Sequence, residues 1–318
     1  MFNRFREIRK PELRAMMRIQ DELLSSLRDY LRGVGFIEIL APIIGPATDP
    51  GIRGAGQVSF NYYGHTFKIM SSMILYKQMA VNSFEKVFAL SPNIRLEPCE
   101  AIETGRHLAE FRQLDLEVAD ASYFDVMRIG EGMVVYCIKR AKRRCEEELE
   151  TLGRKLNVPK TPFKEINYIE AVDFLIKKGF EVKQGEEISW EAETVLSGSF
   201  DDFFWLIDYP KTARGFYDRE DKSRPGVLRD FDLFYPKGFG EAVSGGEREY
   251  EYERVTERMR STGEDPKNYE WYLKMLEEET TPSAGFGIGI ERFTRYICGV
   301  DYIWEAVPFP KVPGIASP

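Results

Sequence analysis

The spacing of apolar residues predicts a long amphipathic helix near the start of the chain. Within residues 11–33, apolar side chains from Leu13 to Leu31 recur every three or four positions, as on one face of a helix. Pro11 at the start and Gly33 at the end are residue types that favour these helix positions. We therefore expect a helix over the whole segment.

Several later segments have the shorter apolar pattern of strands. GFIEILAPII suits a strand that Pro42 ends or places at a sheet edge. VSFNYYGHTFKIM predicts a hairpin with its turn near Tyr63 and Gly64, and EKVFALSPNIRLE with EFRQLDLEVA predicts a second, longer hairpin. Further strand-like pieces are FFWLIDYP, VLRDFDLFYP, FGEAVSGGERE and GFGIGI.

Helical patterns alternate with these strands. A short helix is expected around SSMILYKQMAVNSF, and longer ones at 125–156, 167–179, 249–262, 268–279 and 290–299. Because hairpins rather than parallel crossover units join most strands, we predict an α+β fold with a mostly antiparallel sheet flanked by helices. No interdomain linker is visible, so residues 1–318 are interpreted as one domain, with a helical insertion at about 121–200.

Composition narrows the class of protein. The net charge of -8 and pI near 5.2 argue against a stand-alone nucleic-acid-binding module, although they allow a local basic pocket. The sequence has neither an apolar run of membrane-spanning length nor a secretory leader, so we expect no membrane partner and a cytoplasmic location. The four scattered cysteines are expected to be reduced packing residues: Cys99, Cys137, Cys145 and Cys298.

Arginines in apolar or glycine-rich strands are the first candidates for chemistry. Arg95 interrupts an apolar strand pattern, where an unpaired guanidinium would be costly, so we expect either a bound anion or a salt bridge to Glu97 or Glu117. In GFGIGIERF, alternate glycines leave one strand face without side chains, and Arg292 follows. That face could admit a flat ligand with a phosphate, or it could serve close packing.

These motifs together resemble a known family. The order GFIEILAPII, NIRLE with GRHLAEF, then GFGIGIERF resembles the three motifs of the class II aminoacyl-tRNA synthetase catalytic domain. It is most similar to the aspartyl and asparaginyl branch, over about residues 10 to 316 and including GVDYIWEAVPFPKVPG. The fold of that family, an antiparallel sheet with flanking helices, agrees with the fold predicted from periodicity.

The resemblance implies a site for ATP and Mg²⁺. Arg95 would grip the α-phosphate and Arg292 the γ-phosphate end, which suits charge stabilisation during attack at the α-phosphorus. Asp232 and Glu241 match the carboxylates that hold Mg²⁺, the alternative for both being a solvated turn. The remaining ATP contacts implied are Glu97 to adenine, Phe111 stacked on adenine, and Arg106 with His107 on the outer phosphates.

The resemblance also implies an amino-acid pocket. Arg248 would grip a side-chain carbonyl or carboxylate, and Lys77 and Asp115 match positions typical of the aspartyl branch. A lysine beside an arginine suits a second carboxylate, so L-aspartate is favoured over asparagine. Asp115 and Gln113 would bind the α-ammonium group, and Ser72 would line the pocket. DYPKTARGFYDRED, in contrast, is more similar to the asparaginyl branch.

Three departures from the family shape the expected function. The loop after the first motif has Ile52 and Arg53 where a glutamate is usual, and Ile74 stands where a glutamine is usual, so we expect the substrate grip to differ in detail. The first motif helix begins within about ten residues of Met1, which leads us to expect a catalytic core without the anticodon-binding barrel. With an acidic chain, tRNA is then not an expected partner.

Three functions follow from this interpretation. The first is an ammonia-dependent asparagine synthetase that activates L-aspartate with ATP and Mg²⁺ to the β-aspartyl adenylate and transfers it to ammonia. The second transfers the activated amino acid to tRNA or another acceptor, and the third is a non-catalytic paralogue that binds an amino acid. The sequence leaves open which carboxylate is activated. The resemblance further implies a homodimer built on helix 11–33 and the strand before Pro42.

Overall fold

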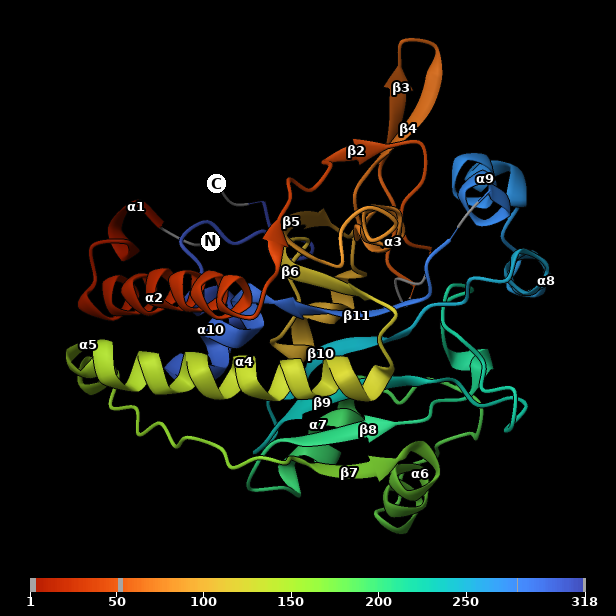
Figure 1. Ribbon diagram of the computed structural model, residues 1–318. Coiled ribbons are helices and arrows are strands. Elements are labelled where there is room, and N and C mark those ends of the chain that lie inside the picture. The colour runs from red at the N-terminus through yellow and green to blue at the C-terminus, as the bar shows by residue number, and fades with distance from the viewer. Residues whose placement is uncertain (1–3, 51–53, 279, 317–318) are drawn as a thin grey trace.

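The computed structural model describes residues 4–50, 54–278 and 280–316. Its centre is a sheet whose strands are, in order across it, β1 (Ile37–Glu38), β5 (Lys86–Ile94), β6 (Glu110–Ala119), β11 (Ser283–Gly289), β10 (Gly240–Glu247), β9 (Asp230–Tyr235), β8 (Phe204–Ile207) and β7 (Lys164–Asn167) (Figure 1). Neighbouring strands from β5 to β8 are antiparallel, and only the two outer pairs, β1 with β5 and β7 with β8, are parallel. The predicted α+β fold is confirmed.

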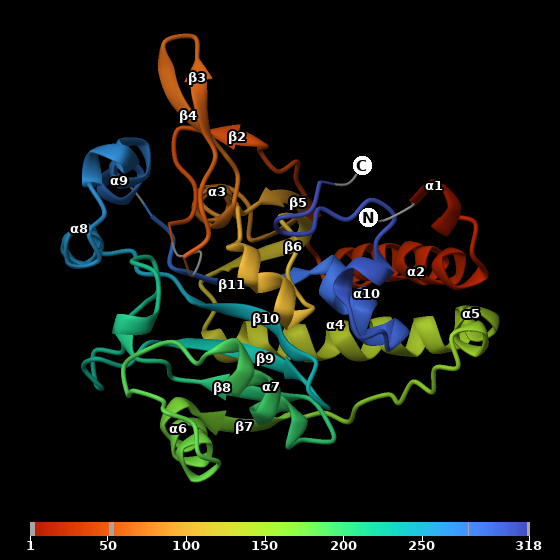
Figure 2. The same ribbon diagram turned by 180° about the vertical axis from the view of Figure 1, so that it is seen from behind.

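One face of the sheet is covered by the long helices. α4 (Tyr123–Arg144) crosses in front of the strands in Figure 1 and behind them in Figure 2, while α2 (Pro11–Gly33) packs against α4, and α10 (Ile290–Cys298) packs beside α2. The apolar stripe predicted for 11–33 faces this layer, where Leu23 and Leu27 are fully buried. Phe286 and Ile288 of β11 point into the same core.

The second long helix differs from its prediction. The segment 125–156 forms two helices, because Cys145 leaves helical geometry at φ -121° and separates α4 from α5 (Glu146–Thr151). The start of α4 is fixed by a capping box in which the Ser122 side chain accepts from the Asp125 amide, and the Asp125 carboxylate accepts from the Ser122 amide.

The segment 121–200, predicted as a helical insertion, contains several helices and one strand. Besides α4 and α5 it contains β7, α6 (Tyr168–Lys177) and α7 (Trp190–Gly198), and β7 extends the sheet as an edge strand. α6 and α7 cover the sheet face opposite to α4, because Phe204 packs against them while its neighbour Trp205 enters the main core. In Figure 2 α7 is seen on this rear face.

Smaller elements complete the molecule. β2 (Ile44–Gly45), β3 (Ser59–Tyr62) and β4 (His65–Ile69) form a second sheet that projects from the body. Its turn is the predicted one, with Tyr63 and Gly64 both at positive φ. The remaining helices are α1 (Arg4–Glu7), α3 (Ile74–Ala80), α8 (Tyr252–Ser261) and α9 (Glu270–Glu278), with 3-10 helices at Cys99–Thr104, Lys211–Ala213, Pro266–Tyr269 and Ile303–Ala306.

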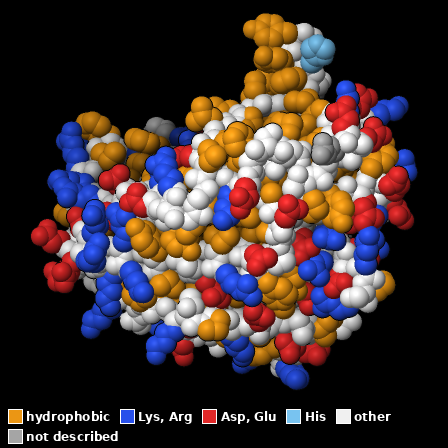
Figure 3. Space-filling view, in the orientation of Figure 1, with side chains coloured by type: hydrophobic (Ala, Val, Ile, Leu, Met, Phe, Trp, Pro, Cys, Tyr) orange, Lys and Arg blue, Asp and Glu red, His pale blue; other side chains and the backbone are white. Residues whose placement is uncertain are grey.

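The surface is mixed in charge, as Figure 3 shows for one face, with hydrophobic side chains gathered on the projecting hairpin. Among the residues described, no helix is both long and apolar enough to cross a membrane. All four cysteines are free. Three of them are buried as expected, whereas Cys99 is exposed and so is not a packing residue.

Candidate active site

A cavity of about 400 Å³ opens on the sheet face opposite to α2 and α4. It is lined by every site residue predicted from the sequence except Asp232: Ser72, Lys77, Arg95, Glu97, Arg106, His107, Phe111, Gln113, Asp115, Glu241, Arg248 and Arg292. Ile74 also lines it, whereas Ile52 and Arg53 lie outside the described residues. Segments far apart in the sequence therefore meet in one hollow.

Two glycines of β11, Gly287 and Gly289, line this cavity. A side chain at Gly287 would begin 1.8 Å from Gln113 Nε2, and one at Gly285 would begin 2.0 Å from Glu117 Oε2. Side chains from the neighbouring strand β6 therefore lie across the bare strand face. The close packing considered for these glycines therefore occurs at 285 and 287, and the approach of a ligand to Gly287 and Gly289 stays a prediction.

Lys77 on α3 is a buried cation at one end of the cavity. Its Nζ donates to Asp115 Oδ1 at 3.1 Å and to the Phe286 carbonyl at 3.0 Å, and it lies 3.6 Å from Glu117 Oε2. Asp115 Oδ2 is buried and has no hydrogen-bond partner among the described residues. The predicted lysine and aspartate are thus in contact, and one acceptor remains at the site.

Arg248 lies beside this lysine. Its Nε and Nη2 donate to the Glu117 carboxylate at 2.9 and 3.2 Å, and its Nη1 is 3.4 Å from Asp218 Oδ1. Glu117 therefore joins both predicted cations, a role that the sequence did not reveal. Burial raises the pKa of Asp218, an effect that the nearby Arg248 opposes.

Arg95 does not use Glu117, one of the two salt-bridge partners considered for it. Its Nε donates to the Ser71 carbonyl at 3.1 Å, and its guanidinium lies 5.2 Å from the centre of the Phe111 ring. At the start of α10, Arg292 Nη1 lies 3.4 Å from Glu241 Oε1, and its Nη2 lies 3.4 Å from His107 Nε2. The positive groups predicted for the triphosphate thus line the same cavity.

Asp232 is placed differently from the prediction that paired it with Glu241. It is fully buried, and its Oδ2 accepts from the Tyr209 hydroxyl at 2.7 Å and from Arg214 Nη2 at 2.6 Å. The Arg214 guanidinium also donates to Ser244 Oγ at 3.2 Å, and it lies 3.7 Å from the centre of the Tyr209 ring. Arg214 was not predicted, although RGFYDRED contains an unusual density of charge.

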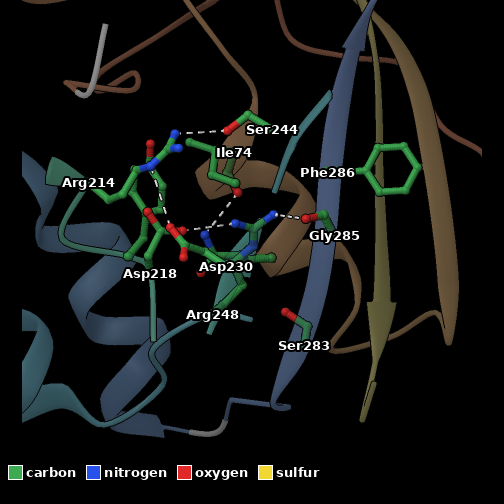
Figure 4. Close-up of polar contacts among 12 residues, drawn as sticks. Ile74, Arg214, Asp218, Asp230, Ser244, Arg248, Ser283, Gly285 and Phe286 are labelled. Atoms are coloured by element: carbon green, nitrogen blue, oxygen red, sulfur yellow. Dashed lines mark hydrogen bonds and ion pairs between the residues drawn. The ribbon is translucent and has the colours of Figure 1, made fainter. Parts of the chain in front are cut away.

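Figure 4 shows this part of the cavity. Arg214, Asp218, Asp230 and Arg248 cluster on one side of β11, and Phe286 points away on the other side. Burial raises the pKa of Asp230 well above its usual range, although Arg214 lies 3.5 Å away and acts in the opposite direction. This end of the site therefore combines cations with buried carboxylates.

The donors present fit Mg²⁺ only in part. No group of three or more His, Cys, Asp or Glu side chains suited to a metal occurs in the described part of the chain. Mg²⁺ in ATP-using enzymes commonly takes one or two carboxylates and completes its shell with phosphates and water. Glu241 lines the cavity and fits this pattern, whereas Asp232 is not among the residues that line the cavity, and its Oδ2 is held by Tyr209 and Arg214.

Helix α7 supplies site residues that sequence reasoning missed. The Trp190 ring lies 4.4 Å from the ring of His107, and the Glu193 carboxylate binds Arg106. The Ser189 side chain accepts from the Ala192 amide and caps the helix, a signal readable in the sequence. These contacts join positions more than 80 residues apart, which pattern analysis does not pair.

This fold and cavity define the catalytic domain of a class II aminoacyl-tRNA synthetase. Residues 1–313 match the family of class II tRNA synthetases for D, K and N, and the chain belongs to that family. It is 34% identical over 314 residues to the asparagine–tRNA ligase of Pyrococcus abyssi, covering 98% of this chain and 71% of the relative. It is also 34% identical over 307 residues to the aspartate–tRNA(Asp/Asn) ligase of Sulfurisphaera tokodaii, covering 96% and 70%.

The structure is similar to solved members of the same family. Asparaginyl-tRNA synthetase from Pyrococcus horikoshii complexed with asparaginyl-adenylate superposes with a TM-score of 0.92 at 33% identity, covering 99% of this chain and 72% of that one. An aspartyl-tRNA synthetase from Entamoeba histolytica superposes with a TM-score of 0.85 at 26% identity, covering 99% and 62%. The named relatives are ligases that act on either aspartate or asparagine.

Proposed function

We propose that the protein activates L-aspartate with ATP and Mg²⁺ and transfers it to ammonia, giving asparagine, AMP and pyrophosphate. The observation that carries the proposal is the buried pair of cations, Lys77 and Arg248, that meet on Glu117 at one end of the cavity. Both cations already contact carboxylates of the chain, namely Asp115, Glu117 and Asp218, so a ligand would meet only the donors that these contacts leave unused.

The hydrogen-bond donors of this pair suit a carboxylate of the ligand. Lys77 has three N–H donors, of which Asp115 and the Phe286 carbonyl take two, and Glu117 Oε2 lies 3.6 Å from the same nitrogen. Arg248 Nη1 has two donors, and Asp218 takes at most one of them. At least one donor of Arg248 therefore remains for the ligand, and a carboxylate offers oxygens that can accept from it.

Aspartate differs from asparagine in having a second carboxylate for the reaction. Formation of asparagine requires that the side-chain carboxylate is activated, so the main-chain carboxylate would lie on Lys77 and Arg248, in place of the side-chain group that the family resemblance implies for Arg248. The α-ammonium group would then donate to Asp115 Oδ2, the acceptor that has no partner among the described residues. This arrangement gives each charged group of the substrate an opposite charge in the pocket.

The first step would form the acyl adenylate. A side-chain carboxylate oxygen attacks the α-phosphorus of ATP, and the bond from that phosphorus to pyrophosphate breaks. Arg95 and Arg292 would stabilise the negative charge that develops on the phosphates. Bound Mg²⁺ would neutralise the leaving pyrophosphate, with Glu241 as its protein ligand.

The second step would consume ammonia. The ammonia nitrogen attacks the acyl carbon and loses a proton, and the acyl–oxygen bond to AMP breaks. Carboxylate side chains that line the cavity would attract ammonium, which must lose a proton to give the attacking ammonia: Asp49, Glu187 and Glu264. The net charge of -8 would also favour ammonium.

Transfer to tRNA is the second candidate, because the similar relatives are named as ligases for tRNA. The two candidates share the adenylate and differ in the acceptor. Purified protein should be incubated with ATP, Mg²⁺ and aspartate, together with either ammonium or tRNA, and AMP, asparagine and aminoacyl-tRNA should be quantified. We expect asparagine and AMP in equal amounts with ammonium. Charging of tRNA without asparagine formation would overturn the ammonia proposal.

We also propose a homodimer, built on α2 and the strand before Pro42. The support for it is an apolar surface beside that strand, where Leu40 is 97% exposed and Ile43 is 61% exposed. Sedimentation equilibrium should give about twice the chain mass of 36.8 kDa. A monomeric mass at micromolar concentration would refute the dimer while leaving the proposed reaction untouched.

A further inference from the structure

We propose that helix α7 is a positioning element for ATP, in which Glu193 and Trp190 hold Arg106 and His107 in place to bind the outer phosphates. This inference rests on the proposed ATP-dependent activation. It assigns a function to a helix that none of the three synthetase motifs contains.

The contact is made by matched pairs of residues. Trp190 and Glu193 are three positions apart and so lie on one face of α7, while Arg106 and His107 are consecutive in the loop that leads into β6. The Glu193 carboxylate binds Arg106 Nη2, and both side chains are almost fully buried, with 1% and 3% exposure. The Trp190 ring packs on His107 at 4.4 Å with an angle of 43°.

Arg106 is bound by Glu193 but keeps hydrogen-bond donors that have no acceptor among the described residues. Its Nε and Nη1 are buried and have no hydrogen-bond partner within the part of the chain that the structure describes. Unpaired N–H groups on a buried guanidinium are costly, and this residue lines the cavity. A phosphate in the cavity could accept from either of the two nitrogens that Glu193 leaves unused, and because Nε–H and Nη1–H point to different sides of the planar guanidinium they would serve different acceptors.

His107 is fixed from a second side. Its Nδ1 lies 2.6 Å from Thr104 Oγ1, and its Nε2 lies 3.4 Å from Arg292 Nη2. Trp190 therefore packs on a ring whose two nitrogens already have hydrogen-bonding neighbours. The indole limits the movement of His107, and with it the loop between Gly105 and β6.

The helix is itself anchored firmly enough to act as a support. Ala192 and Leu196 are buried in the core that α6 and α7 share with Phe204 and Phe234. Ser197 Oγ accepts from the Gly240 amide at 3.2 Å, which ties α7 to the start of β10 immediately before Glu241. One rigid element therefore contacts Arg106, His107 and the strand that carries the proposed Mg²⁺ ligand.

The inference is tested by comparing the affinities for ATP and AMP, because only ATP has the outer phosphates. Glu193→Gln retains the shape of the side chain but loses the charge that fixes Arg106. We expect it to weaken ATP binding about tenfold and to leave AMP binding within about twofold, since charge-assisted hydrogen bonds contribute more than neutral ones. Trp190→Ala should weaken ATP binding in the same selective way.

Isothermal titration calorimetry with ATP, AMP and inorganic pyrophosphate measures these affinities without requiring turnover. Glu191→Gln is the matched control, because Glu191 is exposed on the same helix. The inference would be overturned if wild type, Glu193→Gln and Trp190→Ala all showed the same selectivity for ATP over AMP. Tighter ATP binding by Glu193→Gln would also overturn it, because Glu193 would then compete with phosphate for Arg106. If Glu193→Gln does not fold, Trp190→Ala and Trp190→Phe decide the same question.

The outcome for wild type separates this inference from the proposed function. Wild-type protein that binds neither ATP nor AMP would contradict the proposed ATP-dependent activation itself. Wild-type protein that prefers ATP, with variants that keep this preference unchanged, would contradict only the role of α7. Selective loss of ATP and pyrophosphate binding in both variants supports the positioning role.

Discussion

Glu291, at the start of α10, should make the stability of the protein depend on pH between about 4.5 and about 7. It is 7% exposed, and its two oxygens accept from the Arg112 backbone amide at 2.9 and 3.0 Å. Burial raises its pKa from 4.5 to about 7, against the opposing effect of that hydrogen bond. The folded chain therefore binds this proton more tightly than the unfolded chain does.

The direction and size of the effect follow from that difference. Where the folded state binds more protons, the free energy of unfolding falls as the pH rises, so the contribution of Glu291 is lost between about pH 4.5 and about pH 7. At about 1.4 kcal/mol for each pH unit, the full difference is about 3 kcal/mol. Glu291→Gln cannot ionise and should lack this component.

Urea unfolding of wild type and Glu291→Gln at several pH values from 4.5 to 8 measures the effect. We expect wild type to lose about 3 kcal/mol relative to the variant across this range. Glu257→Gln, which alters an exposed glutamate on α8, controls for the general effect of removing a carboxylate. Parallel curves for wild type and Glu291→Gln would refute the reasoning, because the pKa would then not differ between the folded and unfolded chains.

Three further predictions concern other parts of the molecule. Lys77→Met should reduce aspartate-dependent ATP–pyrophosphate exchange by about 30-fold or more, since it removes a buried charged hydrogen-bond donor; unchanged exchange would show that the pocket is misassigned. Gly285→Ala places a carbon 2.0 Å from Glu117 Oε2 and 2.2 Å from the Leu116 carbonyl oxygen. The free energy of unfolding should therefore fall by about 3 kcal/mol or more, as measured by thermal unfolding, and an unchanged midpoint would contradict this. Leu40→Asp should give a monomer in sedimentation if the exposed strand forms the dimer, and a retained dimer would move the interface elsewhere.

Local patterns in the sequence predicted those parts of the fold that depend on one or two neighbouring segments. The helix over 11–33 was predicted with its observed bounds, because a long apolar stripe with proline and glycine at its ends has few alternative interpretations. The long hairpin of β5 and β6 was also predicted, since two apolar strands flank one polar loop. The nine-residue helix α7 was missed, because so short a segment shows little periodicity.

The candidate site was predictable where a motif carries the chemistry, and not where contacts depend on tertiary structure. Residue patterns singled out Arg95 and Arg292, the resemblance added Arg248, and the cavity brings these three together. Asp232 was assigned to Mg²⁺ from its position in the motif. All six residues of β9 are buried, so the strand lacks the alternation of buried and exposed positions that would indicate which face the Asp232 side chain occupies and what it contacts. Only the fold reveals that Arg214 lies on its carboxylate.

Glu117 has a consequence for how this pocket could change its preferred substrate. One carboxylate accepts from Arg248 and lies 3.6 Å from Lys77, so removal of either cation leaves the other with an altered balance of charge. The two cations should therefore be thermodynamically coupled, and the combined effect of their loss should differ from the sum of the single losses. A pocket that binds a neutral ligand would then require replacement of Lys77 on α3, Glu117 on β6 and Arg248 after β10 together. A protein with only one of these replacements should be less active than either the starting or the final protein.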